Sequence, residues 1–488
     1  MKEKITAWWN KFAMYMRKYS TPAQLTVFLS AITITFLLFV PPINGDADNG
    51  TFFITLHGNG LYQLPNYPYT AYSHIALKYG IMQYFNSYPH PIVSTTTFFV
   101  QIAIALNKLF YSTKIFDIRF LGLTYFMFYL GALYLLTNAF TSKQKTSRDY
   151  AIALVIWFIF SDSSLTLFFN SFYLEPVHLI TMLYAVGAYG LIARRYYRRL
   201  WPMLIVYFVA VFGFIATKQQ NTFFVAGWLL TAFGMFALTK TRVQKLAVAV
   251  TMVLIVGAGL FSNYCVSTKY NDENKYQSMT CGILAESNNP EKALADGGIS
   301  PQFALLRDDP YFKTYTALDV HSKYMKDNFL NKYNYLWITS YYVSHWNQFN
   351  QLLNAAAANA QNMQMYGLGN YPPHSGHPAK AQTHYFMLFT LAMRAFFPRK
   401  FMFYVLIVFV FICFYIYVAF KGMRKKEGEP LMRCMMVMNL IVIMIGTFFG
   451  TIIGGGDADL AQQLFMVPIC LYLLILIFTV DILHKKLW

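Results

Sequence analysis

Long apolar runs, separated by short polar or basic segments, dominate the chain from residue 23 onward. Several runs reach about 18 residues, the length that an α-helix needs to cross the hydrocarbon core of a bilayer. The pattern predicts about ten membrane-spanning helices. Their expected ranges are 23–40, 117–139, 150–168, 176–193, 202–217, 220–238, 244–262, 400–420, 431–453 and 460–480. We therefore expect an all-α polytopic membrane protein.

Basic residues are concentrated in six segments beside these runs. Cytoplasmic loops carry an excess of Lys and Arg, so the clusters orient the chain in the membrane. They lie at 2–18, 143–148, 194–199, 240–245, 421–433 and 485–486. If the run at 94–110 also crossed, the middle clusters would move to the outside, so we expect it to be an interfacial helix on the outer surface. This topology places both termini and all six clusters in the cytoplasm.

The same topology divides the chain into four parts. Residues 1–22 are expected to form an interfacial cytoplasmic helix, and 23–262 to form the first seven spans, including a first outer loop at 41–116 with surface helices. Residues 263–399 should form a small, mostly helical extracytoplasmic domain, and 400–488 the last three spans. The sequence PPINGDAD, and no small-residue cleavage site, follows the run at 23–40, so we expect the first span to be retained.

The composition agrees with a multi-pass protein of the cell (plasma) membrane. Of 488 residues, 57% are hydrophobic and 12% charged, which is more apolar surface than a soluble domain buries. The net charge of +18 follows mainly from the topology and favours contact with anionic membrane lipids. No basic cluster accompanies a soluble reading domain, so nucleic-acid binding is not expected. Cys265 and Cys281 are both expected outside, where an oxidising compartment would allow them to pair.

Acidic residues collect at the outer ends of the predicted spans, where the tetrapeptide GDAD occurs twice. Ionisable groups near membrane depth are costly unless they serve a cavity or a pathway. The acids at this level are Asp46, Asp48, Asp117, Asp162, Glu175, Asp457 and Asp459. A polar site that faces the outer leaflet explains their distribution.

Cationic residues occur at the same level as these acids. Arg119, Lys218 and Arg394 are candidates for binding a phosphate at the depth of the lipid head groups. Arg399 and Lys400 suit snorkelling to those head groups equally well. The combination favours a reaction in which a carboxylate accepts a proton from an attacking hydroxyl and cations stabilise a departing phosphate.

The Asp-x-Asp unit of Asp46 and Asp48 is typical of soluble glycosyltransferases, where it holds a divalent metal against a nucleotide sugar. Nucleotide sugars are absent outside a bacterial-type membrane, so an outer sugar transfer would need a lipid-borne donor, a polyprenyl phosphate. One of the two acids would then be the general base. The alternative role for either acid is to cap a helix that begins near Thr51.

Six motifs carry a resemblance to a known family. They are PPINGDADNGTFF, FFNSFYLEPVH, TKQQN, GILAESNNPEKALADGGISP, LGNYPPHSGHP and GGGDADLAQQLF. With the first span, the outer loop and its surface helices, they resemble the GT-C superfamily of polyprenyl-phosphate-sugar-dependent glycosyltransferases. More narrowly, they resemble bacterial glycan hexose transferases of the WsfD type. The similarity runs along nearly the whole chain in the same order.

This resemblance implies an inverting hexosyltransferase that takes a sugar from a polyprenyl (undecaprenyl) phosphate and adds it to a cell-surface glycan acceptor, in polysaccharide biosynthesis. The base would be Asp48 or Asp46, in the first outer loop. Arg119, Lys218 and Arg394 would bind the donor phosphate. The substrate cavity would include Glu175, Asp162, His178, Asp457 and Asp459. The second GDAD departs from the family pattern, because Gln462 and Gln463 stand where a Lys-His pair is expected.

Other functions and cofactors stay open at this point. A lipid-linked glycan flippase or transporter would predict internal repeats and polar residues at mid-membrane depth. A non-catalytic subunit of a glycan-assembly complex would predict that the acids are dispensable. His374 and His377 have metal-like spacing but lie in a Pro/Gly loop without a nearby acid, so no metal ligand is assigned. A divalent cation is left open as a cofactor.

Overall fold

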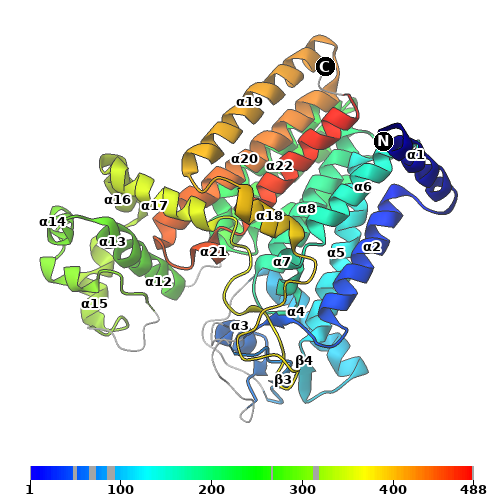
Figure 1. Cartoon of the computed structure of the whole chain (residues 1–488). Helices are drawn as coiled ribbons and strands as arrows, with labels where there is room; N and C mark the ends of the chain where they lie inside the picture. Colours follow the sequence, from blue (N-terminus) through cyan, green and yellow to red (C-terminus); the bar gives the residue numbers. More distant parts are fainter. Residues whose placement is uncertain are drawn as a thin grey trace.

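The computed structural model describes residues 2–47, 52–64, 73–84, 94–264, 268–311 and 318–485. It is a bundle of long helices with short helices and small sheets gathered at one end (Figure 1). Within the described residues, seven helices are long and apolar enough to cross a membrane, or nine if each of two bent helix pairs is one span. The prediction of an all-α polytopic membrane protein is confirmed.

Every predicted span coincides with helix. The helices of the bundle are α2 (Pro22–Leu38), α5 (Arg119–Phe140), α6 (Ser147–Phe160), α8 (Glu175–Ala193), α9 (Trp201–Ile215), α10 (Val225–Gly234), η3 (Met235–Leu238), α11 (Arg242–Tyr264), α19 (Phe401–Arg424), α20 (Gly428–Gly455) and α22 (Met466–Leu483). At 15 residues, α9 is shorter than the 18 residues that a candidate span needs. The helix at its centre is α8, of which 89% is buried inside the protein.

Helices α5 and α8 approach each other closely because Gly187 has no side chain. A Cβ added at Gly187 would lie 2.9 Å from the backbone nitrogen of Leu136, which is too close for any other residue. This contact fixes the pair of helices that carries Arg119 at the start of α5 and Glu175 at the start of α8.

The span predicted at 150–168 is interrupted. Helix α6 ends at Phe160, and the helical segment from Ser163 to Asn170 continues at an angle of 57°. Asp162 lies at the break, where its carboxylate accepts a hydrogen bond from the backbone nitrogen of Ser164 at 3.0 Å. This cap starts the new helix, as Asp commonly does at an N-terminus.

The N-terminal helix α1 (Lys2–Tyr19) is bent by 91° from α2. Thr21 and Gln24 form a capping box at the start of α2, and Pro22 suits its first turn. The indole nitrogen of Trp9 donates to the carbonyl of Ser147 at 3.2 Å, which attaches α1 to α6. A helix at nearly a right angle to a span agrees with the predicted interfacial position.

The predicted basic clusters meet at one end of the bundle, which we name the basic end. Lys143 donates to the carbonyl of Tyr196 at 2.8 Å, and Arg195 donates to the carbonyl of Leu238 at 3.1 Å. Both chain termini lie at this end (Figure 1). The contacts therefore place the clusters on one side, as the charge pattern predicts. The assignment of that side to the cytoplasm rests on the charge pattern itself.

The opposite end, which we name the loop end, holds the two long polar regions. Strand β1 (Gly45–Asp46) pairs antiparallel with β5 (Leu368–Asn370), and β2 (Leu61–Tyr62), β3 (Lys78–Ile81) and β4 (Ile115–Asp117) form a second sheet in that order. The short helices there are α3 (Phe53–Gly58), α4 (Thr95–Phe110), α7 (Ser163–Thr166), η1 (Leu167–Asn170), η2 (Gln219–Phe224), α12 (Thr268–Ser278), η4 (Met279–Ile283), α13 (Leu284–Glu286), α14 (Pro290–Asp296), η5 (Pro301–Leu306), α15 (Lys323–Asn328), η6 (Leu330–Lys332), α16 (Tyr335–Ser344), α17 (Trp346–Asn359), α18 (Leu388–Phe396) and α21 (Leu460–Gln463).

Candidate functional site

The start of the predicted first outer loop is fixed to two distant parts of the chain. Gly45 pairs with Asn370, and the backbone nitrogen of Ala47 donates to the carbonyl of Gly367 at 3.0 Å. The side-chain amide of Asn170 donates to the carbonyl of Asn44 at 2.8 Å. Asp46 is therefore held in a paired strand, with 3% of its surface exposed. Asp48, the other predicted base, lies outside the described residues.

Beyond the tetrapeptide, the loop packs on the start of α8. The ring of Phe52 contacts Phe172 and Tyr173, with centroid distances of 5.6 and 4.9 Å. Glu175 follows two residues after Tyr173. The described residues on either side of 48–51 are thus held by Gly367 at Ala47 and by Phe172 and Tyr173 at Phe52.

Glu175 is the first residue of α8 and is 5% exposed. Its Oε2 atom has no hydrogen-bond partner among the described residues. Lys218 attracts its charge, and Gln462 lies close enough to interact with its carboxylate. Glu175 and Lys218 nevertheless form no direct ion pair, so the carboxylate is buried with one oxygen unsatisfied.

Lys218 lies in the turn between α9 and η2 and is partly buried. Burial lowers the pKa of Lys218 from its ordinary value, and the negative charges of Glu175, Asp459 and Glu273 oppose that shift. The structure thus brings together three of the predicted site residues, Glu175, Lys218 and Asp459. Lys218 is therefore a partly buried cation whose charge is stabilised by acidic residues at the loop end.

His178 and Asn221 hold the turn that carries Lys218. The Nδ2 atom of Asn221 donates to the carbonyl of Phe214 at 2.6 Å and to Nε2 of His178 at 2.7 Å. Both side chains are buried, with 6% of His178 and 4% of Asn221 exposed. His178, predicted to line the cavity, thus contacts Asn221, whose backbone nitrogen donates to the carbonyl of Lys218 at 3.0 Å. The sequence analysis did not single out Asn221, although its position in TKQQN, between two apolar helices, was a usable signal.

Arg119 does not lie beside Lys218. Its guanidinium forms a two-point contact with Asp117, at 2.9 and 2.6 Å, and the Asp117 side chain is 1% exposed. Ser94, at the start of α4, donates to the carbonyl of Thr217 at 2.8 Å, whereas Asn107, near the end of α4, accepts from the backbone nitrogen of Asp117 at 3.0 Å. The twelve residue steps from 95 to 107 span about 18 Å of helix, so the two cations lie at opposite ends of α4.

Asp162 and Arg394 belong to a different contact. The Oδ2 atom of Asp162 accepts from the backbone nitrogen of Thr390 at 3.0 Å, and Ser164 and Thr390 share a hydrogen bond of 2.7 Å. Asp162 is 1% exposed and thereby ties the break after α6 to α18. Arg394, one turn beyond Thr390, is exposed. The geometry gives Asp162 a structural role in attaching α18.

The second GDAD lies between α20 and α21, and its two acids have different surroundings. The backbone nitrogen of Asp457 donates to the carbonyl of Cys281 at 3.0 Å. Partial burial, and then repulsion by Asp308 and Glu286, raises the pKa of Asp457. Asp457 and Asp459 are both exposed, and Asp459 contributes to the electrostatic surroundings of Lys218.

Gly456 permits this turn. Its φ of +63° is disfavoured for other residues, and an added Cβ would overlap the carbonyl of Cys281. Cys281 is a free, buried thiol. Its predicted partner Cys265 lies outside the described residues.

No group of three or more His, Cys, Asp or Glu side chains that could hold a metal ion occurs within the described ranges. His377 instead stacks on Tyr371, with 3.7 Å between ring centroids. His374 adopts a positive φ of 63° in the same loop. These contacts give the histidines of PPHSGHP a role in shaping the loop.

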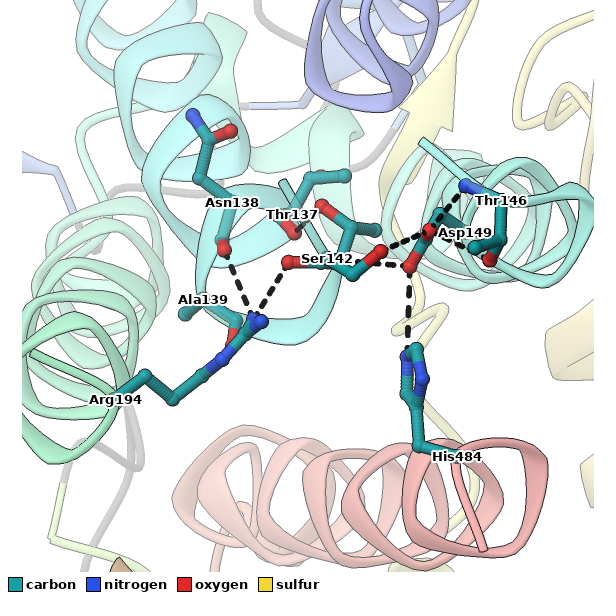
Figure 2. Close-up of polar contacts among 9 residues, drawn as sticks. Thr137, Asn138, Ala139, Ser142, Thr146, Asp149, Arg194 and His484 are labelled. Carbon is teal, nitrogen blue, oxygen red and sulfur yellow. Dashed lines mark hydrogen bonds and ion pairs between the residues drawn. The ribbon is translucent and has the colours of Figure 1, made fainter. Parts of the chain in front are cut away.

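A second polar cluster, at the basic end, was not anticipated from the sequence. Asp149 is fully buried and accepts four hydrogen bonds of 2.6–2.7 Å from Ser142 and Thr146, and His484 lies 3.5 Å away (Figure 2). Arg194 donates to the carbonyls of Asn138, Ala139 and Thr141.

Arg433 extends this cluster. Its guanidinium lies between Glu429 at 2.6 Å and Asp481 at 3.0 Å. A cavity of about 70 Å³, lined in part by Arg194, Arg433 and His484, lies among these groups and has room for a few water molecules. The charges balance one another, so this cluster joins helices and offers little net attraction for a ligand.

The bundle of apolar helices, with a polar site at one end, defines a multi-pass membrane protein. The family model for the YfdI N-terminal transmembrane domain matches residues 9–488, so the chain belongs to this family. A search of curated proteins found no match, and a search of solved structures found none either.

Proposed function

We propose that the protein is a GT-C-like membrane glycosyltransferase that transfers a hexose from a polyprenyl-phosphate donor to a cell-surface glycan outside the cytoplasmic membrane. The observation that carries the proposal is the convergence of three elements at the loop end. The first outer loop, Glu175 at the start of α8 and Lys218 in the turn before η2 all lie there, at the ends of apolar helices. Membership of the YfdI transmembrane family supports it.

Lys218 is the group that we assign to the donor phosphate. Within the described residues Lys218 has no direct ion pair, whereas the guanidinium of Arg119 is already bound to Asp117. A phosphate binds more favourably beside a cation that is not already neutralised by an ion pair. This favours Lys218 over Arg119. Its position at the end of α9 lets the polyprenyl chain lie along apolar helices.

The base that we assign is Asp48 or Asp46. The acceptor hydroxyl attacks the anomeric carbon, and its proton passes to the carboxylate. The bond between the anomeric carbon and the phosphate oxygen breaks, and the polyprenyl phosphate leaves with the electron pair. A single displacement of this kind inverts the anomeric configuration. The burial of Asp46 in a paired strand favours Asp48 as the base.

The test is sugar transfer by purified protein from a defined polyprenyl-phosphate hexose to an isolated cell-surface glycan. Loss of a general base lowers the rate by about 10²–10⁴-fold, so Asp48→Asn or Asp46→Asn should show a loss of this size. Asp296→Asn, at an exposed position on α14, is the matched control and should keep wild-type activity. Full activity in both loop variants would overturn the mechanism.

The side of the membrane is tested separately. Single cysteines introduced as Asp296→Cys at the loop end and Glu427→Cys at the basic end, both exposed, should differ in their reaction with a membrane-impermeant maleimide in whole cells. Labelling at 296 and protection at 427 is the expected result. The reverse pattern would place the site in the cytoplasm. A lipid-borne donor would then no longer be the only available sugar source.

A further inference from the structure

The carboxylate of Glu175 is a buried charge whose hydrogen bonding is incomplete. It is 5% exposed, and Oε2 has no partner among the described residues. A buried carboxylate without its hydrogen bonds is destabilising by several kcal/mol in general, so such groups are usually completed by a ligand or by water. Lys218 and Glu175 attract each other electrostatically, and no ion pair joins the two side chains.

Glu175 and Lys218 can bind different parts of a ligand. A carboxylate only accepts hydrogen bonds, and an ammonium only donates them. A phosphodiester has acceptor oxygens and no donor, so it suits Lys218 and cannot satisfy Glu175. Sugar hydroxyls are donors and do satisfy a carboxylate. A molecule that carries a sugar directly on a phosphate therefore meets both requirements at once.

The surroundings of Glu175 agree with a sugar. Tyr173, two residues before Glu175, packs its ring on Phe52, and Gln462, with both donor and acceptor capacity, interacts with the carboxylate of Glu175. Asn221 and His178 fix the turn of Lys218, so the distance between cation and carboxylate is set by buried contacts.

We propose that Glu175 recognises the sugar of the lipid-linked donor by accepting hydrogen bonds from its hydroxyls, while Lys218 binds the adjoining phosphate. Glu175 is thus a specificity-determining residue, distinct from the general base in the first outer loop. This inference rests on the proposed function, because it takes the polyprenyl-phosphate hexose as the ligand. It adds the residue that distinguishes a glycosylated donor from the bare lipid phosphate product.

The experiment compares binding of two kinds of lipid to the purified full chain in nanodiscs, in the absence of acceptor. One is polyprenyl phosphate, and the other is a panel of polyprenyl phosphates that carry glucose, galactose or mannose. Glu175→Ala and Glu175→Gln should weaken binding of the preferred glycosylated lipid tenfold or more and leave polyprenyl phosphate within about twofold. Lys218→Gln should weaken binding of both lipids. Glu291→Ala, an exposed acid on α14, is the matched control.

Retained binding of polyprenyl phosphate by the Glu175 variants shows that they are folded. Equal weakening of both lipids, or no weakening of either, would overturn the role of Glu175 while leaving the proposed transferase function standing. A wild-type protein that binds neither lipid would overturn the proposed function, and the inference with it.

Discussion

Asp149 provides the sharpest test of how the basic end is stabilised (Figure 2). Its carboxylate accepts from the backbone nitrogens of Ser142 and Thr146, each at 2.6 Å, and from both hydroxyls. Asp149→Ala removes all four bonds. The hydroxyls can turn to other acceptors, but two backbone N–H groups lose their partner, at about 1–3 kcal/mol each. Because both residues are only partly buried, we expect a loss of about 3 kcal/mol.

The assay is thermal unfolding in detergent. Unfolding is monitored by the reaction of Cys434 and Cys470 with a thiol-reactive fluorophore. Both thiols are buried in the folded protein. With an unfolding entropy typical of a chain of this length, the loss corresponds to a decrease of about 3 °C in the apparent Tm. Glu427→Ala, an exposed acid near the basic end, should melt like the wild type. Coincident melting curves for Asp149→Ala and Glu427→Ala would refute the reasoning.

Three further outcomes follow from the loop end. Donor binding, measured by lipid titration across pH, should weaken as the pH rises through the lowered pKa of Lys218, because the ammonium loses its charge there. Lys218→Arg should bind the donor without that decline, since the guanidinium stays charged. Asn221→Ala removes the donor that holds the Lys218 turn, and a loss of about 1 kcal/mol predicts roughly fivefold weaker donor binding. Gly456→Ala should increase the reaction of Cys281 with maleimide, whereas Gly450→Ala, where an added Cβ meets nothing within 4 Å, should not; equal labelling would contradict the close contact.

Much of the architecture was predictable from the sequence because it depends on length and charge. Apolar runs near residues 23–40 and 431–453 became α2 and α20, since only a helix satisfies its own backbone in a bilayer. The basic clusters converge on one end, as the charge rule predicts. The break at Asp162 was less predictable, because an Asp in an apolar run fits either a cavity or a helix cap, and the contact with Thr390 decides between them.

Within the candidate site, residue types were easier to predict than partners. Arg119 and Lys218 looked equivalent as cations at the ends of spans, yet Arg119 is paired with Asp117, whereas no ion pair joins Lys218 to another described residue. His178 was predicted as a cavity residue, and its contact with Asn221 gives it a positioning role. These distinctions depend on which side chains meet across the chain, and spacing along the sequence does not encode them.

By itself, the sequence determined the class of protein, the approximate spans, the grouping of basic segments and the acids and cations that mark the polar end. These follow from hydrophobicity and charge, which act locally along the chain. The packing of distant segments was needed to learn that the two acids of the second GDAD have separate surroundings, that Asp162 attaches α18, and that no ion pair joins Glu175 to Lys218. Those outcomes depend on the packing of residues that are far apart in sequence, where distances of a few ångströms determine which charges are neutralised and which remain available to a ligand.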